Sequence, residues 1–193
     1  MKKWIWIVLA ILVIGGFFFY SSSTRLVSRE EAVNGAWANV ETQYQRRSDL
    51  IPNLVNTVKG YAEHERTTLE EVTDARTRAT SINLSVDELT PEQLERYQAA
   101  QAEVRTALGR LLAVAENYPD LKANENFREL QAQLEGTENR IAVARRDFNE
   151  TARGYNVAVR RFPTNIVASL CGFEKKPYFE AAEGSDVAPK VEF

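Results

Sequence analysis

The spacing of apolar residues is the most regular pattern in this chain, and it is helical after residue 28. Up to residue 81 the apolar side chains recur at steps dominated by three and four: Val33, Trp37, Val40, Tyr44, Ile51, Leu54, Val58, Tyr61, Leu69 and Val72. Such spacing lines one face of a packed helix, whereas a half-buried strand alternates at every second residue. The pattern therefore predicts one long helix.

Local signals set the expected limits of this helix. Ser28 and Glu31 form a capping-box signature, so we expect the helix to begin there. We expect it to end near Ser81, which gives a length of about 80 Å at 1.5 Å per residue. Pro52 lies inside it, and because the apolar face stays in phase across this proline we expect a kink and not a break.

Two more long helices and one short helix are expected further on. Residues 90–93 (Thr-Pro-Glu-Gln) combine a cap, a proline at the first helical position and a glutamine that completes the capping box. That helix should end before Tyr118-Pro119. A third should begin within residues 122–126 and end at Pro163. The sequence thus predicts an all-α fold, a long up-and-down bundle of three long helices and a short fourth.

The short fourth helix is expected at residues 164–170, because Gly172 provides a stop signal. Residues 173–193 contain Gly, Ser and Pro near the chain end, and we expect a loosely ordered tail there. With the N-terminal segment described next, this divides the chain into an anchor and linker at 1–27, a helical bundle at 28–172 and a tail at 173–193.

The N-terminal segment has the length and composition of a membrane span. Residues 4–20 carry no charge, and a bilayer core needs about 17–25 apolar residues. Trp4, Trp6 and Tyr20 lie at the two ends, where amphipathic rings favour the headgroup region. A cleaved signal peptide is the alternative, since Lys2 and Lys3 precede the apolar run. The bulky residues that end the run favour an uncleaved, single-pass anchor.

The charges that flank this anchor predict which side the bundle occupies. Lys2, Lys3 and the amino terminus favour the cytoplasmic side, which places residues 21–193 outside the cytoplasm. Arg25 and Arg29 on the other flank oppose this orientation, although two glutamates follow them. We therefore expect a single-pass protein of the cell membrane whose bundle lies outside the cytoplasm.

Composition and charge exclude several classes of protein. The chain is 44% hydrophobic and 26% charged, which is typical of an ordered protein. Two of the 24 basic side chains lie in the first 20 residues, so the rest of the chain has 22 basic and 27 acidic side chains. A body with this excess of acidic residues argues against nucleic-acid binding. Cys171 is the only cysteine, so it forms no internal disulfide and no cysteine-rich metal site.

Polar residues interrupt or flank the apolar faces of the predicted helices. We expect eight of them to form a buried polar network: Arg47, Glu65, Arg76, Glu116, Glu138, Arg145, Asn149 and Asn156. Because an unpaired buried charge costs several kcal/mol, such groups should pair between helices. The expected register places Arg76, Glu138 and Arg145 in one layer. The interpretation we favour is that these residues fix the register of the helices. The alternatives are that they bind a ligand or that they are exposed to solvent.

Known catalytic arrangements have no match in the sequence. A di-iron bundle needs Glu-x-x-His motifs on two helices, and a zinc-protease helix needs two histidines, but His64 is the only histidine. No glycine-rich phosphate loop and no G-x-S-x-G motif occurs. We therefore predict no catalytic, cofactor-binding or metal-binding residues, and no small-molecule substrate.

The beginning of the first predicted helix has no partner in the expected register. The second helix covers the first only back to about residue 54 in that register. An exposed apolar face of that length is rarely tolerated in water. We expect this seam to bind a second copy or a protein partner, unless another helix covers it; its residues are Val33, Trp37, Val40 and Tyr44.

A series of different short motifs is spread along residues 28–175, and each occurs once. In chain order they are Ala36-Trp37, Arg46-Arg47, Asp49 to Val55, Gly60-Tyr61, His64-Glu65, Ala75-Arg76, Tyr118-Pro119, Glu138, Ile141-Ala142, Ala144-Arg145, Phe148-Asn149, Tyr155-Asn156 and Phe162-Pro163. This set resembles the LemA family of bacterial membrane proteins; Phe148 is more often Tyr in that family. The resemblance implies a single transmembrane segment, a four-helix up-and-down bundle and no assigned enzymatic activity.

Two functions remain open at this point. The first is a membrane-anchored helical scaffold that binds protein partners at the cell envelope. The second is a ligand sensor or hydrolase that uses Glu65, Glu138, Arg76 and Arg145 in a pocket of the bundle. A bundle without a cavity of roughly 300 Å³ or more would argue against the second.

Overall fold

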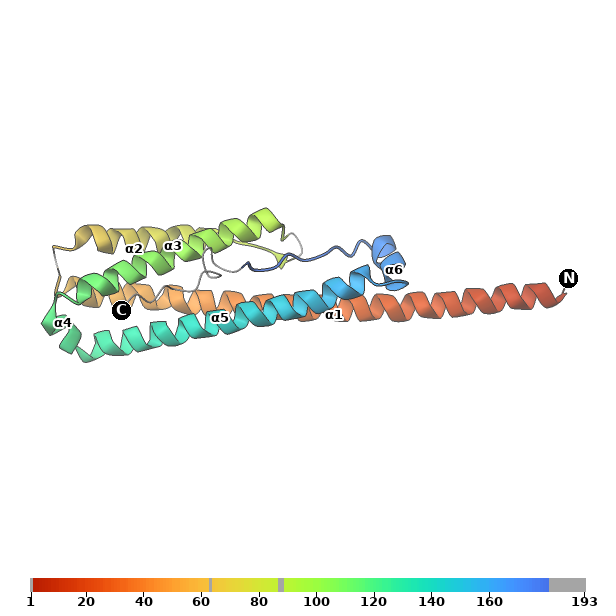
Figure 1. Ribbon diagram of the computed structural model, residues 1–193, viewed down its shortest axis with the longest axis horizontal. Helices are drawn as coiled ribbons and strands as arrows, with labels where there is room; N and C mark the ends of the chain where they lie inside the picture. The colour runs from red at the N-terminus through yellow and green to blue at the C-terminus, as the bar shows by residue number, and fades with distance from the viewer. Residues whose placement is uncertain (1, 63, 87–88, 181–193) are drawn as a thin grey trace, which may run out of the picture.

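The computed structural model describes residues 2–62, 64–86 and 89–180, and within these residues it contains six helices and no strand. The helix bounds are α1 Lys2–Lys59, α2 Arg66–Ser81, α3 Pro91–Ala115, α4 Pro119–Ala123, α5 Glu125–Arg160 and α6 Thr164–Cys171. Figure 1 shows an elongated molecule in which α2, α3 and α5 lie along the C-terminal part of α1 while its N-terminal part protrudes. The all-α class and the bundle are confirmed.

Several helix ends follow the signals read from the sequence. Thr90 caps α3: its Oγ1 accepts from the Gln93 N–H at 3.2 Å, and Gln93 Oε1 accepts from the Thr90 N–H at 2.9 Å. Asn124 caps α5 by accepting from the Phe127 N–H at 2.9 Å. Gly172 ends α6 in a left-handed conformation with φ 76°, which glycine adopts without a steric penalty.

The predicted single helix over residues 28–81 begins earlier than expected and is interrupted: a helix does end at Ser81, but it is α2, which residues 60–65 separate from α1. The span and the first bundle helix are one helix, α1, so Ser28 lies in its interior and caps nothing. The capping box needs free backbone N–H groups, and a preceding helical turn had already satisfied them. At the other end the N–H groups of Tyr61 and Ala62 both bond to the Val58 carbonyl, and the chain turns into α2 after Gly60. Pro52 lies inside α1 without ending it.

Two hydrophobic cores lie one after the other along the bundle. The distal core, farther from the N-terminus, contains Ile51, Leu54, Val58, Leu69, Val72, Ala75, Ala79, Val104, Leu108, Leu111, Leu121, Phe127 and Leu134. Here α1, α2, α3 and α5 run alternately up and down (Figure 1). The proximal core contains Leu26, Val33, Trp37, Val40, Tyr44, Leu94, Tyr97, Ile141, Phe148, Tyr155, Val159, Val167 and Phe179.

The seam that was expected to bind a second copy or a protein partner is part of the intramolecular core. Val33 and Val40 are completely buried, and the Trp37 ring lies 5.6 Å from Tyr97 and 5.5 Å from Phe148 between ring centroids. The prediction failed because it assumed a first helix ending at Ser81. Since α1 ends at Lys59, the later helices pack about six turns closer to the N-terminus. In this position α5 covers the seam.

The segment expected to be a loose tail is partly core as well. Residues 173–180 return along α5, and Phe179 is only 5% exposed; its ring stacks on Trp37 with centroids 5.8 Å apart. This segment occupies, beside the proximal core, the space that α2 fills in the distal half (Figure 1). The rest of the expected tail, residues 181–193, lies outside the described residues.

Candidate functional site

A central polar layer separates the two hydrophobic cores. It consists of Arg47 on α1, Gln101 on α3 and Glu138 on α5, each three or four residues from its core neighbours. Arg47 Nη1 donates to Glu138 Oε1 at 2.7 Å, and Arg47 Nη2 donates to Gln101 Oε1 at 2.5 Å and to its carbonyl at 3.1 Å. Only 3% of the Arg47 side chain is exposed, so this one guanidinium joins three helices inside the bundle.

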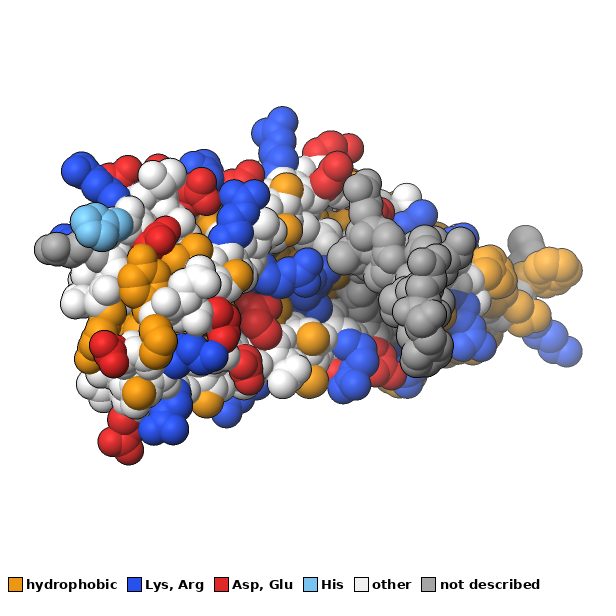
Figure 2. Space-filling view, turned by 60° about the vertical axis from the view of Figure 1, so that its left-hand side comes forward, with side chains coloured by type: hydrophobic (Ala, Val, Ile, Leu, Met, Phe, Trp, Pro, Cys, Tyr) orange, Lys and Arg blue, Asp and Glu red, His pale blue; other side chains and the backbone are white. Residues whose placement is uncertain are grey.

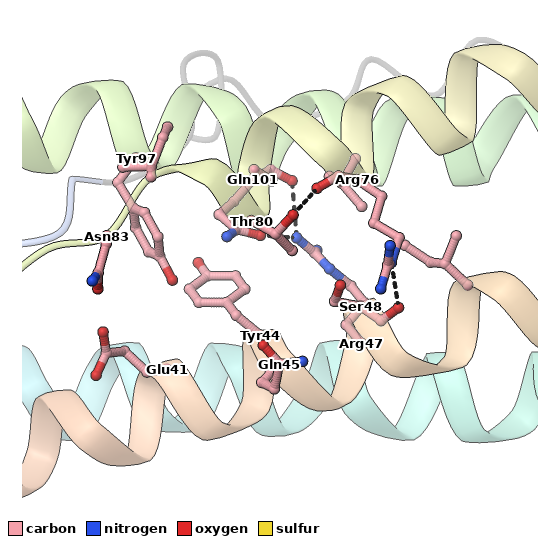
Figure 3. A pocket seen from close by; sticks show the side chains of 14 residues that line it. Glu41, Tyr44, Gln45, Arg47, Ser48, Arg76, Thr80, Asn83, Tyr97 and Gln101 are labelled. Carbon is pink, nitrogen blue, oxygen red and sulfur yellow. Dashed lines mark hydrogen bonds between the residues drawn. The ribbon is translucent and has the colours of Figure 1, made fainter.

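A polar cleft of about 280 Å³ opens beside this layer, between α1, α2 and α3. Figure 3 shows the side chains of Arg47, Tyr97 and Gln101 converging on it from different helices. Arg76 on α2 spans its rim, with Nε donating to the Ser48 carbonyl at 2.9 Å. The hydroxyl of Ser48 is buried and has no hydrogen-bond partner among the described residues.

The acidic groups of the cleft are held in their neutral forms more than usual. Burial raises the pKa of the Tyr44 phenol, and burial and the nearby Tyr44 raise that of Tyr97, so both phenols are even harder to ionise than an ordinary tyrosine. Burial also raises the pKa of Glu41, and the Trp37 indole partly opposes this by stabilising the carboxylate. The cleft therefore offers neutral hydroxyl groups and bound guanidinium groups, a set suited to polar recognition.

The polar residues of α5 bind the returning C-terminal segment. Asn149 accepts a hydrogen bond from the Phe179 N–H and donates one to the Phe179 carbonyl, and both bonds are 2.8 Å long. Asn156 makes the same pair of bonds with Lys176, at 2.9 and 2.8 Å. Arg145 donates to the Glu180 carbonyl at 2.9 Å, and its guanidinium lies 4.8 Å from the centre of the Phe179 ring. These side chains supply the hydrogen bonds that a neighbouring strand would otherwise give.

Lys176 places a second ionic group inside the bundle. Its Nζ lies 3.1 Å from Glu30 Oε1 and donates to the Val86 carbonyl at 3.3 Å. The Tyr155 hydroxyl donates to the same Glu30 oxygen at 3.4 Å, and its pKa is raised by burial and by that carboxylate. Lys176 is not among the polar residues predicted from the sequence, because a lysine in a polar chain end carries no periodic signal.

The eight residues predicted to form one network are distributed over separate places. Glu65 and Glu116 lie at the distal end, where Glu65 accepts from the Tyr118 hydroxyl at 3.1 Å and Glu116 pairs with Lys122. The expected partner of Glu138 was wrong: Glu138 pairs with Arg47, and Arg76 bonds the α1 backbone. The register error explains this, because residues 28–81 were taken as one helix, whereas the first helix ends 22 residues before Ser81, at Lys59.

The described residues hold no cluster of three metal-ligating side chains. His64 lies exposed in the turn between α1 and α2, the pale blue side chain of Figure 2, and Cys171 is exposed at the end of α6. Around His64, Figure 2 shows acidic and basic side chains mixed over the distal part of the bundle. The chemistry of this surface is that of a solvated helical face.

The class of protein defined by these observations is a helical bundle built on a long helix whose first part is apolar. That helix, α1, is the one helix among the described residues that is long and apolar enough to cross a bilayer. The chain matches the LemA family over residues 36–193, and it belongs to this family. The resemblance found in the sequence is confirmed, and with the apolar helix it supports a membrane-associated protein.

Individual relatives match most of the chain at low identity. Magnetosome protein MamQ 2 of Paramagnetospirillum magneticum is 28% identical over 177 residues, which cover 83% of this chain and 65% of the relative. Magnetosome protein MamQ of Magnetospirillum gryphiswaldense is 26% identical, over 86% of this chain and 68% of the relative. Protein LemA of Metamycoplasma hominis is 25% identical, over 95% and 81%. The chain thus spans less than two thirds of the length of the first of these.

Proposed function

We propose that this protein is a membrane-anchored helical platform that binds protein partners at the bacterial cell envelope. The observation that carries the proposal is the continuity of α1, which passes from the apolar residues 4–20 into the bundle without a break. Its first buried side chains, Ser22 and Leu26, follow directly after the apolar run. An anchor joined in this way fixes the tilt and rotation of the bundle, whereas a flexible linker would leave both free.

The chemistry of the bundle supports binding over catalysis. The buried ionic groups are satisfied by one another and by backbone carbonyls, and the tyrosines of the cleft are held neutral. The names of the relatives, two of them magnetosome proteins and one LemA, describe no enzyme activity. A rigid bundle with a mixed-charge surface supplies what a platform needs, which is a fixed arrangement of exposed side chains.

The bundle is proposed to stand on the extracytoplasmic side, because the basic residues Lys2 and Lys3 precede the span. A cysteine at exposed Thr67, with Cys171→Ala, reports the side directly. A membrane-impermeant maleimide should label it in intact cells with the outer layers made porous. Labelling only after the inner membrane is opened would place the bundle in the cytoplasm.

Continuity of α1 can be tested at the junction without changing the chain length. The triple variant Ser21→Gly, Ser23→Gly, Thr24→Gly introduces a flexible joint, and the same triple change to Ala keeps the helix. A photo-crosslinking residue at Val143, Glu103 or Thr67 then records partners in intact membranes. We expect a defined set of protein adducts in the native and alanine chains, and a severalfold loss in the glycine chain. Equal adducts in all three, or none at any position, would contradict the proposal.

A second candidate function is recognition of a small polar ligand in the cleft. The buried Ser48 hydroxyl, which has no hydrogen-bond partner among the described residues, favours it, while the volume of about 280 Å³ lies just below the roughly 300 Å³ at which ligand sites begin. Thr80→Phe should close the cleft from its exposed rim, and Thr77→Phe on the same helix is the matched control. A compound retained by the native and Thr77→Phe proteins but lost from Thr80→Phe would establish this function.

A further inference from the structure

A groove of about 410 Å³ lies at the end of the bundle from which α1 protrudes. It runs between α1 and the turn that joins α5 to α6, a place visible in Figure 1. Its floor on α1 begins at Phe18, near the end of the apolar run, and continues to Arg29. In a chain whose residues 4–20 span a bilayer, this groove lies at the depth of the lipid headgroups.

The charges in the groove have one sign. Arg25 and Arg29 come from α1 and Arg161 from the end of α5, and none of the described side chains that line the groove is acidic. Arg29 already donates to the Gly154 carbonyl at 2.7 Å and joins α1 to α5. Arg25 and Arg161 are exposed, so their guanidinium groups are available to an anion at the mouth.

Apolar side chains occupy the same groove. Phe162 is 75% exposed and Val157 56% exposed, and both line the same groove as Phe18. Large exposed apolar groups next to arginines are typical of segments that lie in a membrane interface, where the rings enter the acyl boundary and the charges meet phosphates.

The short helix α6 adds an apolar face at the same end. Val167 and Ala168 pack against the bundle, while Ile166 and Leu170 remain exposed, with Leu170 73% exposed. Their spacing of four residues places them on one side of the helix. This face and the groove are continuous in the chain through the turn at Phe162 and Pro163.

We propose that this groove binds one anionic phospholipid of the bilayer that α1 spans. The phosphate lies between Arg25 and Arg161, the start of an acyl chain lies along Phe18 and Phe162, and the exposed face of α6 rests on the headgroup layer. The lipid would fix the bundle against the membrane surface, in addition to its anchor. This inference rests on the proposed function, because it requires the span to be in a bilayer.

The test uses the full-length chain in detergent, with phosphatidylglycerol and phosphatidylcholine added in turn, and native mass spectrometry to count retained lipids. We expect one phosphatidylglycerol to be retained and phosphatidylcholine to be lost. The double variant Arg25→Gln, Arg161→Gln should bind phosphatidylglycerol about 25-fold more weakly, roughly fivefold for each arginine. The matched control Arg78→Gln, Arg110→Gln removes two exposed arginines of the distal half and should bind like the native chain.

Three results would overturn the lipid site. Equal retention of both lipids would remove the role of the phosphate charge, and equal loss in the two double variants would remove the groove. Full competition by soluble glycerophosphate would assign the arginines to a free anion instead of a lipid. Flotation with vesicles separates this inference from the anchor: a chain that floats with both lipids but shows no preference contradicts only the lipid site, and one that floats with neither contradicts the anchor.

Discussion

The distal and proximal cores are built along the same three helices, α1, α3 and α5, but they are closed by different structures. In the distal core α2 supplies the fourth side with small and aliphatic residues such as Leu69, Val72 and Ala75. In the proximal core an extended segment, residues 173–180, supplies it with the Phe179 ring. A helix satisfies its own backbone groups, whereas an extended segment needs partners for them.

This difference explains why α5 carries polar residues on the face that contacts residues 173–180. Asn149 and Asn156 hydrogen-bond to the backbone N–H and carbonyl groups of Phe179 and Lys176, two residues buried against the bundle. No such side chains are needed against α2, because its carbonyl and N–H groups bond within the helix. Most of the buried aromatic rings also lie in the proximal core, among them Trp37, Phe148 and Phe179. The comparison teaches that the polar residues of one helix face can mark a non-helical neighbour.

The largest effect is expected from the aromatic centre of the proximal core. Trp37→Ala should lower the free energy of unfolding by about 3–5 kcal/mol, because it removes a ring that contacts three others. Urea unfolding of the full chain in detergent measures this. Leu111→Ala in the distal core is the comparison, with an expected loss of about 2–5 kcal/mol. A small change for Trp37→Ala would mean that the seam is not core in solution.

The next effect concerns the polar layer between the two cores. Glu138→Ala leaves the Arg47 guanidinium buried with Gln101 as its remaining partner, and should cost about 2–3 kcal/mol. The value lies below that of a fully buried pair because 35% of the Glu138 side chain is exposed. The double variant Arg47→Met, Glu138→Leu should cost clearly less than the sum of its single changes, as unfolding curves will show. Strict additivity would contradict the pairing.

A smaller and more local effect is expected where α5 holds the returning segment. Asn156→Ala removes the two hydrogen bonds that this side chain makes to the Lys176 backbone, a loss of about 1–3 kcal/mol. Because the segment can detach without unfolding the helices, hydrogen exchange should accelerate at residues 173–180 far more than in α2 or α3. Asn53→Ala, on the exposed side of α1, is the control and should change neither. Uniform acceleration over all helices would show that the segment does not open separately.

The smallest effect is a pH dependence at the edge of the cleft. Burial raises the pKa of Glu41, so the folded chain binds its proton more tightly than the unfolded chain. Stability from this group is therefore full below the model-peptide value of about 4.5 and declines as the pH rises through the raised folded pKa. Glu41→Gln should flatten this slope in pH-dependent thermal unfolding. Glu92, whose pKa is lowered by the capping interactions at the start of α3, should show the opposite sign.

Helix signals within a few residues of one another could be read directly from the chain. The cap at Thr90, the stop at Gly172 and the apolar run before Ser21 depend on local backbone needs, and the structure has each in its expected place. The periodic apolar residues also identified the buried face correctly, including Trp37 and Val40. These features depend on steric and hydrogen-bonding preferences that act over one or two turns.

The pairing of distant residues followed from a single break that local signals do not locate. Pro52 is compatible with a helix that continues, and Gly60 is compatible with a helix that ends. The packing of α2 against α1 and α3 favours an end of α1 just before Gly60. The additional break after Lys59, which the sequence did not predict, changed the partner of Glu138 from Arg76 to Arg47 and covered the seam. The burial of Lys176 and Phe179 likewise depends on α5 reaching back along α1. Register is a property of whole faces in contact, so it depends on the assembled bundle.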